Sequence, residues 1–438
     1  MVTEIGRRPA IDAASLAVFR ILFGLLMAVS TVRFMALGWV GEFYVVPTFH
    51  FTWDLLPWVA PLPAPLMYGL FSALVVLALA VAAGFHYRLC TALFFAGFTY
   101  VELIDKTTYL NHYYLASLLS GLLVFLPANA VWSVDAWRRP GAYSPTIPSW
   151  TVDLLRFQIG VVYVFAGLAK INADWLLEAQ PLRIWLAASS DMPIVGPLFA
   201  QVWAAYVFSW FGAAYDLAIV IFLLWRPTRP VAYATVVLFH VMTALLFPIG
   251  MFPWIMIAVT TIFFPPDWPR RFIGGRGKAQ AHPLQPIGQA TSMAMSIRTA
   301  AFIAVYVVIQ VALPLRAYWP GADPEWTCRG FNFAWRVMLV EKAGHTELVA
   351  ADRGTGRQWP IRTRDYVTER QEKMMAQDPF MIRALARHVA DDLRARGAGN
   401  VEVRADSFAA LNGHPLQRLI DPAVDLSAAV PPNWIVPR

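Results

Sequence analysis

Charge and cysteine are both scarce in this sequence. Lys, Arg, Asp and Glu together make up 14% of its 438 residues, against about a quarter in an ordinary soluble protein, while 58% of the residues are hydrophobic. This composition excludes an ordinary soluble domain and predicts an integral membrane protein. The net charge of +7 is then attributed to orientation in the membrane, and nucleic acid is not an expected partner. The two cysteines, Cys90 and Cys328, are too few for a disulfide framework.

Apolar runs recur along the first three quarters of the chain. A helix needs about 20 apolar residues to cross a bilayer. On that measure the expected spans are residues 13–36, 64–85, 89–104, 110–127, 152–170, 204–225, 231–247, 251–265 and 298–315. The third, fourth and eighth are short, so the predicted architecture is an α-helical membrane bundle of about nine transmembrane helices. The first run is too long for a signal peptide and is interpreted as a retained span.

Basic residues divide the connections between these spans into two groups. If the N-terminus is inside, the inside segments carry Arg7, Arg8, Arg88, Arg138, Arg139, Arg226, Arg229, Arg270, Arg271, Arg276 and Lys278. The first outside loop, 38–63, has no lysine or arginine, and the other outside connections contain only Lys106, Lys170 and Arg183. This agrees with the positive-inside rule. An odd number of spans then places the C-terminal region on the outer face.

The composition changes after the last span. Charged residues become more frequent, and strand-like pieces occur at 346–350 and 401–404. Asp378 and Pro379 are a helix-starting pair, and the amphipathic pattern that follows them ends near Gly397. The C-terminal region is therefore predicted to contain both strands and a helix.

We predict two domains from this change. A transmembrane helical domain is expected over residues 1–315, and a small soluble α+β domain on the outer face over 316–438. The Pro-, Gly- and Gln-rich segment 266–297 is expected to be a flexible linker on the inner side. Cys90 and Cys328 fall on opposite sides in this topology, so no disulfide is expected between them.

Polar side chains gather at the outer ends of several spans. Asn111 and His112 begin the fourth span, and Lys170 ends the fifth. His240 lies in the outer part of the seventh, before the turn at 249–253. Removing water from an amine favours its uncharged form, which can act as a base. A base, a histidine and an amide at one membrane depth therefore predict an active site.

Each of these residues also has a structural interpretation. A lysine at a helix end commonly extends to the lipid head groups, and a lone histidine in a bundle commonly hydrogen-bonds to another helix. No two histidines have metal-ligand spacing on one helix, so the sequence does not support a metal site. Arg20 and Asp216 lie within spans, where an unpaired charge is costly. Each is expected to have a polar partner, more often in a structural ion pair than in catalysis.

A set of short segments occurs in a fixed order from the first span to the outer domain. They are residues 18–24 (VFRILFG), 84–90 (GFHYRLC), 105–115 (DKTTYLNHYYL), 132–135 (WSVD), 166–175 (AGLAKINADW), 239–240 (FH), 249–254 (IGMFPW) and 417–422 (QRLIDP). Taken together, the sequence resembles the vitamin K-dependent gamma-carboxylase family, whose membrane part belongs to the horizontally transferred transmembrane (HTTM) domain group.

The resemblance implies a membrane enzyme with a quinone cofactor. Such an enzyme oxidises vitamin K hydroquinone with O2 to the epoxide, removes a proton from the γ-carbon of a protein glutamate, and adds CO2 to give γ-carboxyglutamate. By the same resemblance, Lys170 is the base that deprotonates the hydroquinone and His112 positions or assists that step. Asn111, His240 and Met251 are implied at the quinone site, and no metal is implied.

Two other functions stay open from the sequence. One is a vitamin K hydroquinone epoxidase without glutamate carboxylation, which needs the same lysine. The other is a non-enzymatic membrane protein that binds quinone or lipid. The expected partners are the lipid bilayer and a glutamate-containing peptide or protein. The expected location is a bacterial inner membrane, with the N-terminus cytoplasmic and the C-terminal domain periplasmic.

Overall fold

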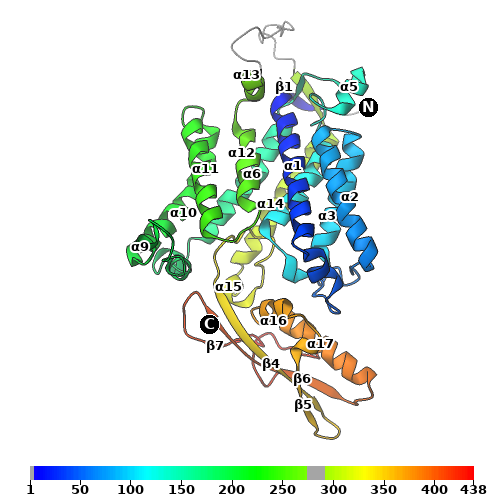
Figure 1. Ribbon diagram of the computed structural model, residues 1–438, viewed down its shortest axis with the longest axis vertical. Coiled ribbons are helices and arrows are strands. Elements are labelled where there is room, and N and C mark those ends of the chain that lie inside the picture. The colour runs from blue at the N-terminus through cyan, green and yellow to red at the C-terminus, as the bar shows by residue number, and fades with distance from the viewer. Residues whose placement is uncertain (1–3, 274–291) are drawn as a thin grey trace.

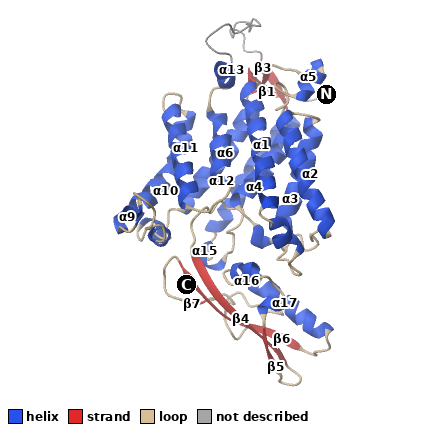
Figure 2. Ribbon diagram, viewed as in Figure 1, coloured by secondary structure: helices blue, strands red, loops and turns tan. Residues whose placement is uncertain are grey.

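A bundle of apolar helices forms the larger part of the molecule (Figure 1; Figure 2). The computed structural model describes residues 4–273 and 292–438. Its long helices are α1 (Ala14–Ala36), α2 (Ala64–Ala83), α3 (Tyr87–Ile104), α4 (Asn111–Phe125), α6 (Trp150–Ala169), α10 (Val202–Leu224), α11 (Arg229–Leu246), α12 (Phe252–Thr260) and α14 (Ile297–Leu315). They lie where the nine spans were predicted. Seven of the described helices are long and apolar enough to cross a membrane, whereas α4 and α12 are shorter.

Short helices connect or extend these elements. They are α5 (Val134–Arg138), α7 (Ala173–Leu176), α8 (Leu182–Ala187), α9 (Gly196–Phe199), α13 (Trp268–Ile273) and α15 (Pro324–Thr327). The helix ends follow the local sequence. For example, α2 has proline in its first turn and stops at Gly84, whose φ of 67° is a left-handed conformation that glycine adopts without strain.

Helices α1 and α2 approach each other closely at a small-residue contact. A Cβ atom added to Gly24 would lie 2.6 Å from the Ala78 carbonyl oxygen and 2.8 Å from the Ala82 Cβ. Small residues let helix backbones in a membrane come this close. The rest of the α1 inner face is filled by large side chains such as Phe19 and Met27, both 1% exposed.

Substituting Gly24 is therefore expected to push the two helices apart. Gly24→Ala should destabilise the protein by on the order of 1–3 kcal/mol through overpacking, measured as a lower thermal unfolding midpoint in detergent. The matched control is Gly69→Ala in α2, because no atom of residues 4–273 or 292–438 lies within 4 Å of a Cβ at that position. Equal midpoints for the two variants would contradict the close contact.

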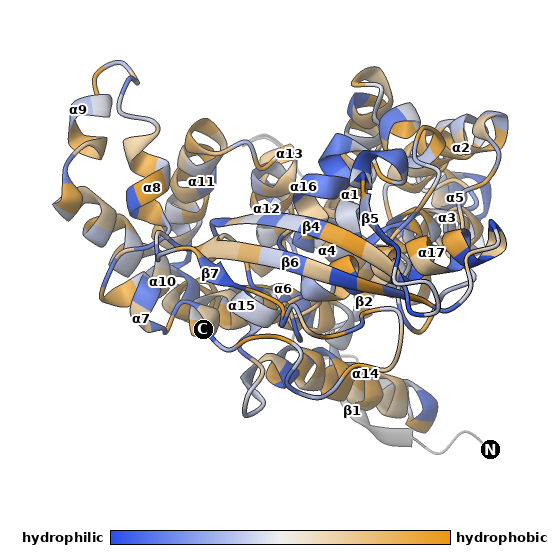
Figure 3. Ribbon diagram, turned by 90° about the horizontal axis from the view of Figure 1, so that it is seen from below, coloured by the Kyte–Doolittle hydropathy of each residue, from blue (hydrophilic) through white to orange (hydrophobic). Residues whose placement is uncertain are grey.

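The C-terminal region is a four-stranded antiparallel sheet with helices. The strand order is β5-β4-β6-β7, with β4 (Lys342–Asp352), β5 (Gln358–Ile361), β6 (Val401–Leu411) and β7 (Gln417–Arg418), joined by α16 (Glu369–Met375) and α17 (Pro379–Ala395). The buried face of α17 contributes Ile382, Leu385 and Val389, all fully buried. Figure 3 shows β4 and β6 lying across the end of the bundle. The predicted helix, with Asp378 as its N-cap, is confirmed, and both predicted strands are longer than expected.

A second small sheet at the opposite end was not predicted. Strand β1 (Glu4–Asp12) pairs with β2 (Thr146–Pro148) and β3 (Ser292–Ser296). The predicted linker 266–297 is wrong at its flanks, because α13 and β3 are regular structure, while residues 274–291 lie outside the described residues. Partners more than 130 residues apart cannot be read from a local pattern. Asp12 also pairs with Arg270 at 2.8 Å, which joins β1 to α13.

The basic connections lie together at the end of the bundle that carries this second sheet. Helices α5 and α13 and the loop between α10 and α11 are at that end, and the β4–β7 sheet is at the other (Figure 1). The distribution of charge along the sequence therefore matches the two ends of the folded molecule.

Candidate functional site

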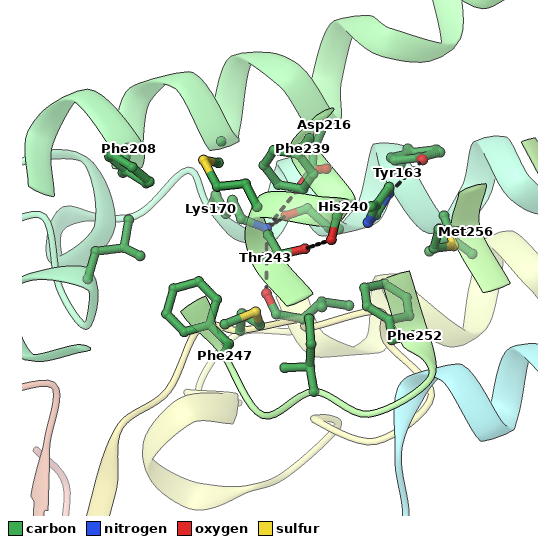
Figure 4. Close-up of a pocket in the computed structure, with 18 of the residues that line it drawn as sticks. Tyr163, Lys170, Phe208, Asp216, Phe239, His240, Thr243, Phe247, Phe252 and Met256 are labelled. Carbon is green, nitrogen blue, oxygen red and sulfur yellow. Dashed lines mark hydrogen bonds and ion pairs between the residues drawn. The ribbon is translucent and has the colours of Figure 1, made fainter. Parts of the chain in front are cut away.

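A cavity of about 740 Å³, including the open space at its mouth, lies between α6, α10, α11 and α12. It is at the end of the bundle that faces the C-terminal sheet. Most of its lining is apolar, and its polar groups come from Tyr163, Lys170, Asp216, His240 and Thr243 (Figure 4). An apolar cavity with a few polar groups is the usual form of a small-molecule site.

Lys170 and Asp216 form a buried ion pair in this cavity. Lys170 caps the C-terminal end of α6, and its Nζ donates to Asp216 Oδ2 on α10 at 2.8 Å. The two residues are only 5% and 6% exposed. The same amine lies 3.3 Å from the Ala166 carbonyl oxygen and 5.1 Å from the centre of the Trp175 ring. The ion pair expected for Asp216 is therefore confirmed, and its partner is the candidate base itself.

His240 and Tyr163 form the second polar group of the cavity. The Tyr163 hydroxyl and His240 Nε2 are 3.1 Å apart, and Tyr215 lies 3.5 Å from the same hydroxyl. His240 Nδ1 is buried and has no hydrogen-bond partner among the described residues. An unpartnered buried nitrogen at a cavity wall can serve a bound ligand. Figure 4 shows Lys170 and His240 on the same cavity, with Thr243 between them.

Tyr163 was not predicted as a site residue, although its spacing from Lys170 in the sequence pointed to it. Tyr163 precedes Lys170 by seven residues, which is about two turns of α6 and places both side chains on one face. Asp216 was selected only as a group needing a partner.

His112, Asn111 and Met251 lie beside the cavity and are not part of its lining. The His112 ring is 5.9 Å from the ring of Phe252, which in turn is 5.8 Å from His240. His112 is therefore separated from the cavity by the Phe252 side chain. Met251 precedes Phe252 as the N-cap residue of α12. Of the five residues predicted for the site, Lys170 and His240 line the same cavity, and the other three lie outside its lining.

A segment that we call the cap loop, residues 329–340, covers the outer side of the cavity. Val337 and Met338 of this loop line the cavity, and the Val337 carbonyl oxygen lies 3.5 Å from Lys170 Nζ. Phe333, Trp335 and Met338 have positive φ angles of 62°, 55° and 54°. Such angles are uncommon in residues other than glycine and occur often at functional sites.

Contacts with the bundle hold the cap loop, and those of Trp335 and Arg336 are two of them. Trp335 is 1% exposed and stacks on Tyr114 of α4, with ring centres 4.8 Å apart. Asn111 Nδ2 donates to the Arg336 carbonyl oxygen at 3.3 Å. Asn111, predicted at the site, thus contacts the loop that covers the cavity.

Other polar groups singled out in the sequence have structural partners. Arg20 donates to the carbonyl oxygens of Ala128 and Trp132, at 2.9 and 2.5 Å. The polar partner expected for Arg20 is therefore confirmed, but among the described residues it is the backbone and not the acidic side chain of an ion pair. These two carbonyl groups lie in the connection after α4, so they are not used in the hydrogen bonds of a helix. Burial raises the pKa of Cys328 to about 12, helped by the charge of Asp378. Cys90 and Cys328 are both free thiols.

One group of side chains in the outer region has the spacing of metal ligands. Asp174, Glu178 and His414 bring their ligand atoms within 4.8 Å of one another. Arg438 and Asn412, however, already donate to the two oxygens of Asp174. A guanidinium on the central carboxylate makes this an ion-pair network.

Two family models match the chain in succession. The HTTM domain matches residues 8–268, which is more than half of the chain. The lumenal domain of vitamin K-dependent gamma-carboxylase matches residues 296–438. The chain belongs to the vitamin K-dependent gamma-carboxylase family. No solved structure matches it.

Membership in the gamma-carboxylase family confirms the resemblance found in the sequence. It assigns a membrane protein with a vitamin K-dependent, gamma-carboxylase-like function at the level of the family, with protein glutamate as the type of substrate. The cavity lies in the part matched by the HTTM domain, and the cap loop lies in the part matched by the lumenal domain.

Proposed function

We propose that the protein carboxylates glutamate side chains of a polypeptide, using vitamin K hydroquinone, O2 and CO2, with formation of vitamin K epoxide. The observation that carries this proposal is the Lys170 amine, which is buried on the wall of an apolar cavity and paired with Asp216. A hydroquinone has an apolar body and two opposed hydroxyl groups. The cavity supplies an apolar lining with Lys170 on one part of its wall and His240 on another.

The residues present fit this ligand. His240 Nδ1 has no partner among the described residues and can bind one oxygen of the hydroquinone, while the Tyr163 hydroxyl fixes the imidazole ring through Nε2. Reduced vitamin K, once bound, would supply with O2 the strong base that removes the γ-proton and would end as the epoxide and water, while CO2 would add to the carbanion. The protein itself holds the hydroquinone ring, excludes water and accepts a proton.

Lys170 accepts the hydroquinone proton in this proposal. The amine must first be uncharged, and its 2.8 Å contact with Asp216 allows the ammonium proton to pass to the carboxylate. The neutral amine then takes the hydroxyl proton, and the pair carries one added proton. General-base catalysis requires the base within hydrogen-bond reach of the proton it removes, which the position of Lys170 on the cavity wall provides.

The other predicted residues are assigned supporting roles. His112 and Met251 orient Phe252, which forms part of the cavity wall. Asn111 holds the cap loop through Arg336. A closed, dry cavity would protect a carbanion from protons of bulk water.

We place the domain boundary between residues 315 and 316, with the quinone site in 1–315 and the glutamyl substrate entering beside 316–438. The quinone would enter from the lipid bilayer, and the polypeptide from the aqueous side of the C-terminal sheet. With basic connections at the opposite end, this sheet would lie in the periplasm of a bacterium and the N-terminus in the cytoplasm.

The proposal is tested with purified protein in lipid nanodiscs. Vitamin K hydroquinone, O2, labelled bicarbonate and a glutamate-rich peptide are supplied, and epoxide and fixed label are measured in parallel. Equal formation of both products is the expected result. Epoxide without label from several peptides would replace the proposal with an epoxidase function. Neither product, with saturable binding of the hydroquinone, would indicate a quinone-binding protein without enzymatic activity.

A further inference from the structure

The segment that follows Lys170 holds one side of its amine. Asn172 caps α7, accepting from the Trp175 backbone N–H at 2.8 Å. The Trp175 indole is 3% exposed and donates to the Ser209 carbonyl oxygen of α10 at 2.8 Å. Its ring centre is 5.1 Å from Lys170 Nζ. The position of Trp175 therefore determines part of the surroundings of the amine.

Asp174, the residue before Trp175, is bound by three groups of the C-terminal region. Asn412 Nδ2 donates to Oδ2 at 3.1 Å, His414 Nε2 lies 2.9 Å from Oδ1, and Arg438 donates to both oxygens at 3.1 and 3.2 Å. Burial raises the pKa of the Asp174 carboxyl, but hydrogen bonds from these three groups outweigh it, so the pKa is lowered. The carboxylate is thus held in its charged form.

Asn412 also holds the cap loop, which contacts the other side of the amine. Its Nδ2 lies 3.3 Å from the Leu339 carbonyl oxygen, and its Oδ1 accepts from the Glu341 N–H at 2.9 Å. Leu339 is two residues after Val337, whose carbonyl oxygen lies 3.5 Å from Lys170 Nζ. Asn412 is 3% exposed, so these contacts are made in a buried setting.

We propose that Asp174 and Asn412, supported by His414 and Arg438, are positioning residues that hold the Lys170 amine between Trp175 and Val337. Asp174 fixes Trp175 and Asn412 fixes the cap loop, and their side chains bind each other. The C-terminal sheet thereby sets the geometry of an amine in the helical bundle. The importance of this for turnover rests on the proposed function, but the positioning itself does not.

The test measures the accessibility of the amine directly. The full-length protein in nanodiscs is treated with N-hydroxysuccinimidyl acetate, and acetylation of each lysine is followed by mass spectrometry. The variants are Asn412→Gly, which tolerates the left-handed φ of 51° at this position, and Asp174→Asn. The matched control is Arg353→Ala, which removes an arginine from two other carboxylates of the C-terminal region, Glu402 in β6 and Asp425 after β7.

Loss of the positioning contacts is expected to speed acetylation of Lys170 about tenfold or more by local opening, with Lys342 still protected. Lys342 is 6% exposed in the same region and reports unfolding of the sheet. Lys342 follows Glu341, whose N–H is bound by Asn412, so Lys342 is a stringent control for opening that spreads into the sheet. Unchanged acetylation of Lys170 would overturn the proposal. Faster acetylation of Lys170 and Lys342 together would also overturn it, because the contacts would then only stabilise the sheet.

Epoxide formation is measured on the same samples. The variants are expected to lose about 10- to 100-fold in kcat, since small misplacements of a catalytic group have effects of this size, with the KM for the peptide unchanged. If wild-type protein forms no epoxide, the proposed function fails, while the acetylation rates still decide whether the amine is positioned in this way.

Discussion

Replacing Lys170 is expected to abolish epoxide formation and glutamate carboxylation together. A positioned general base contributes about 10²–10⁴ in rate, so Lys170→Ala should lower both activities by at least about 100-fold. The loss should be in kcat, because the apolar lining that binds the hydroquinone is unchanged. Both products are to be measured over a range of hydroquinone concentrations in nanodiscs.

Two further variants separate the chemistry of Lys170 from its role in the fold. Lys170→Arg keeps a cation beside Asp216, but a guanidinium does not give up its proton in proteins, so this variant should fold and remain inactive. Lys106→Ala removes a lysine that pairs with the exposed Asp54 and should retain full activity. Substantial activity in Lys170→Arg would show that no uncharged amine is needed at this position, and the assignment of Lys170 as the base would be wrong.

The long helices of the bundle were predictable because composition alone marks each of them. Segments such as α2 and α10 combine high hydropathy with few charges, and a ruler of about 20 residues finds them. The small inner sheet was not predictable, since β1 pairs with strands distant in the sequence. The positions of α4 and α12 were also found, although their short lengths left the number of spans uncertain from sequence.

The candidate site was predictable only in part, for physical reasons that differ from residue to residue. Lys170 and His240 stand out because polar groups within a membrane span are costly. The same cost indicated that Asp216 has a partner. The sequence could not show that this partner is Lys170, which lies 46 positions away at the end of another helix.

The path of the cap loop over the cavity carried no signal in the sequence. Gly330 is one of its left-handed residues, but Phe333, Trp335 and Met338 are not glycines, so turn chemistry did not mark those three positions. The contact of Val337 with Lys170 spans 167 positions and arises from the packing of the C-terminal region on the bundle. The contacts of Asn412 and Asp174 have the same origin.

The Lys170–Asp216 pair leads to a second large effect, on stability. Removing one member of a buried ion pair leaves an uncompensated charge, which typically costs about 3–5 kcal/mol. Asp216→Leu and Lys170→Met should each lower the thermal unfolding midpoint strongly, because each strands the other charge in an apolar cavity. Unfolding in detergent, followed by light scattering and tryptophan fluorescence, measures the shift.

The double variant Lys170→Met with Asp216→Leu is expected to recover most of that stability. Replacing both members by apolar side chains removes the charges together and is often neutral or stabilising by about 1–4 kcal/mol. Arg394 and Asp391 provide a matched exposed pair on α17, where single substitutions should change stability by less than about 1 kcal/mol. Equal losses in the single and double variants would contradict a buried ion pair. A double variant that is more stable than the wild-type protein and forms no epoxide would show that the pair is kept for activity at a cost in stability.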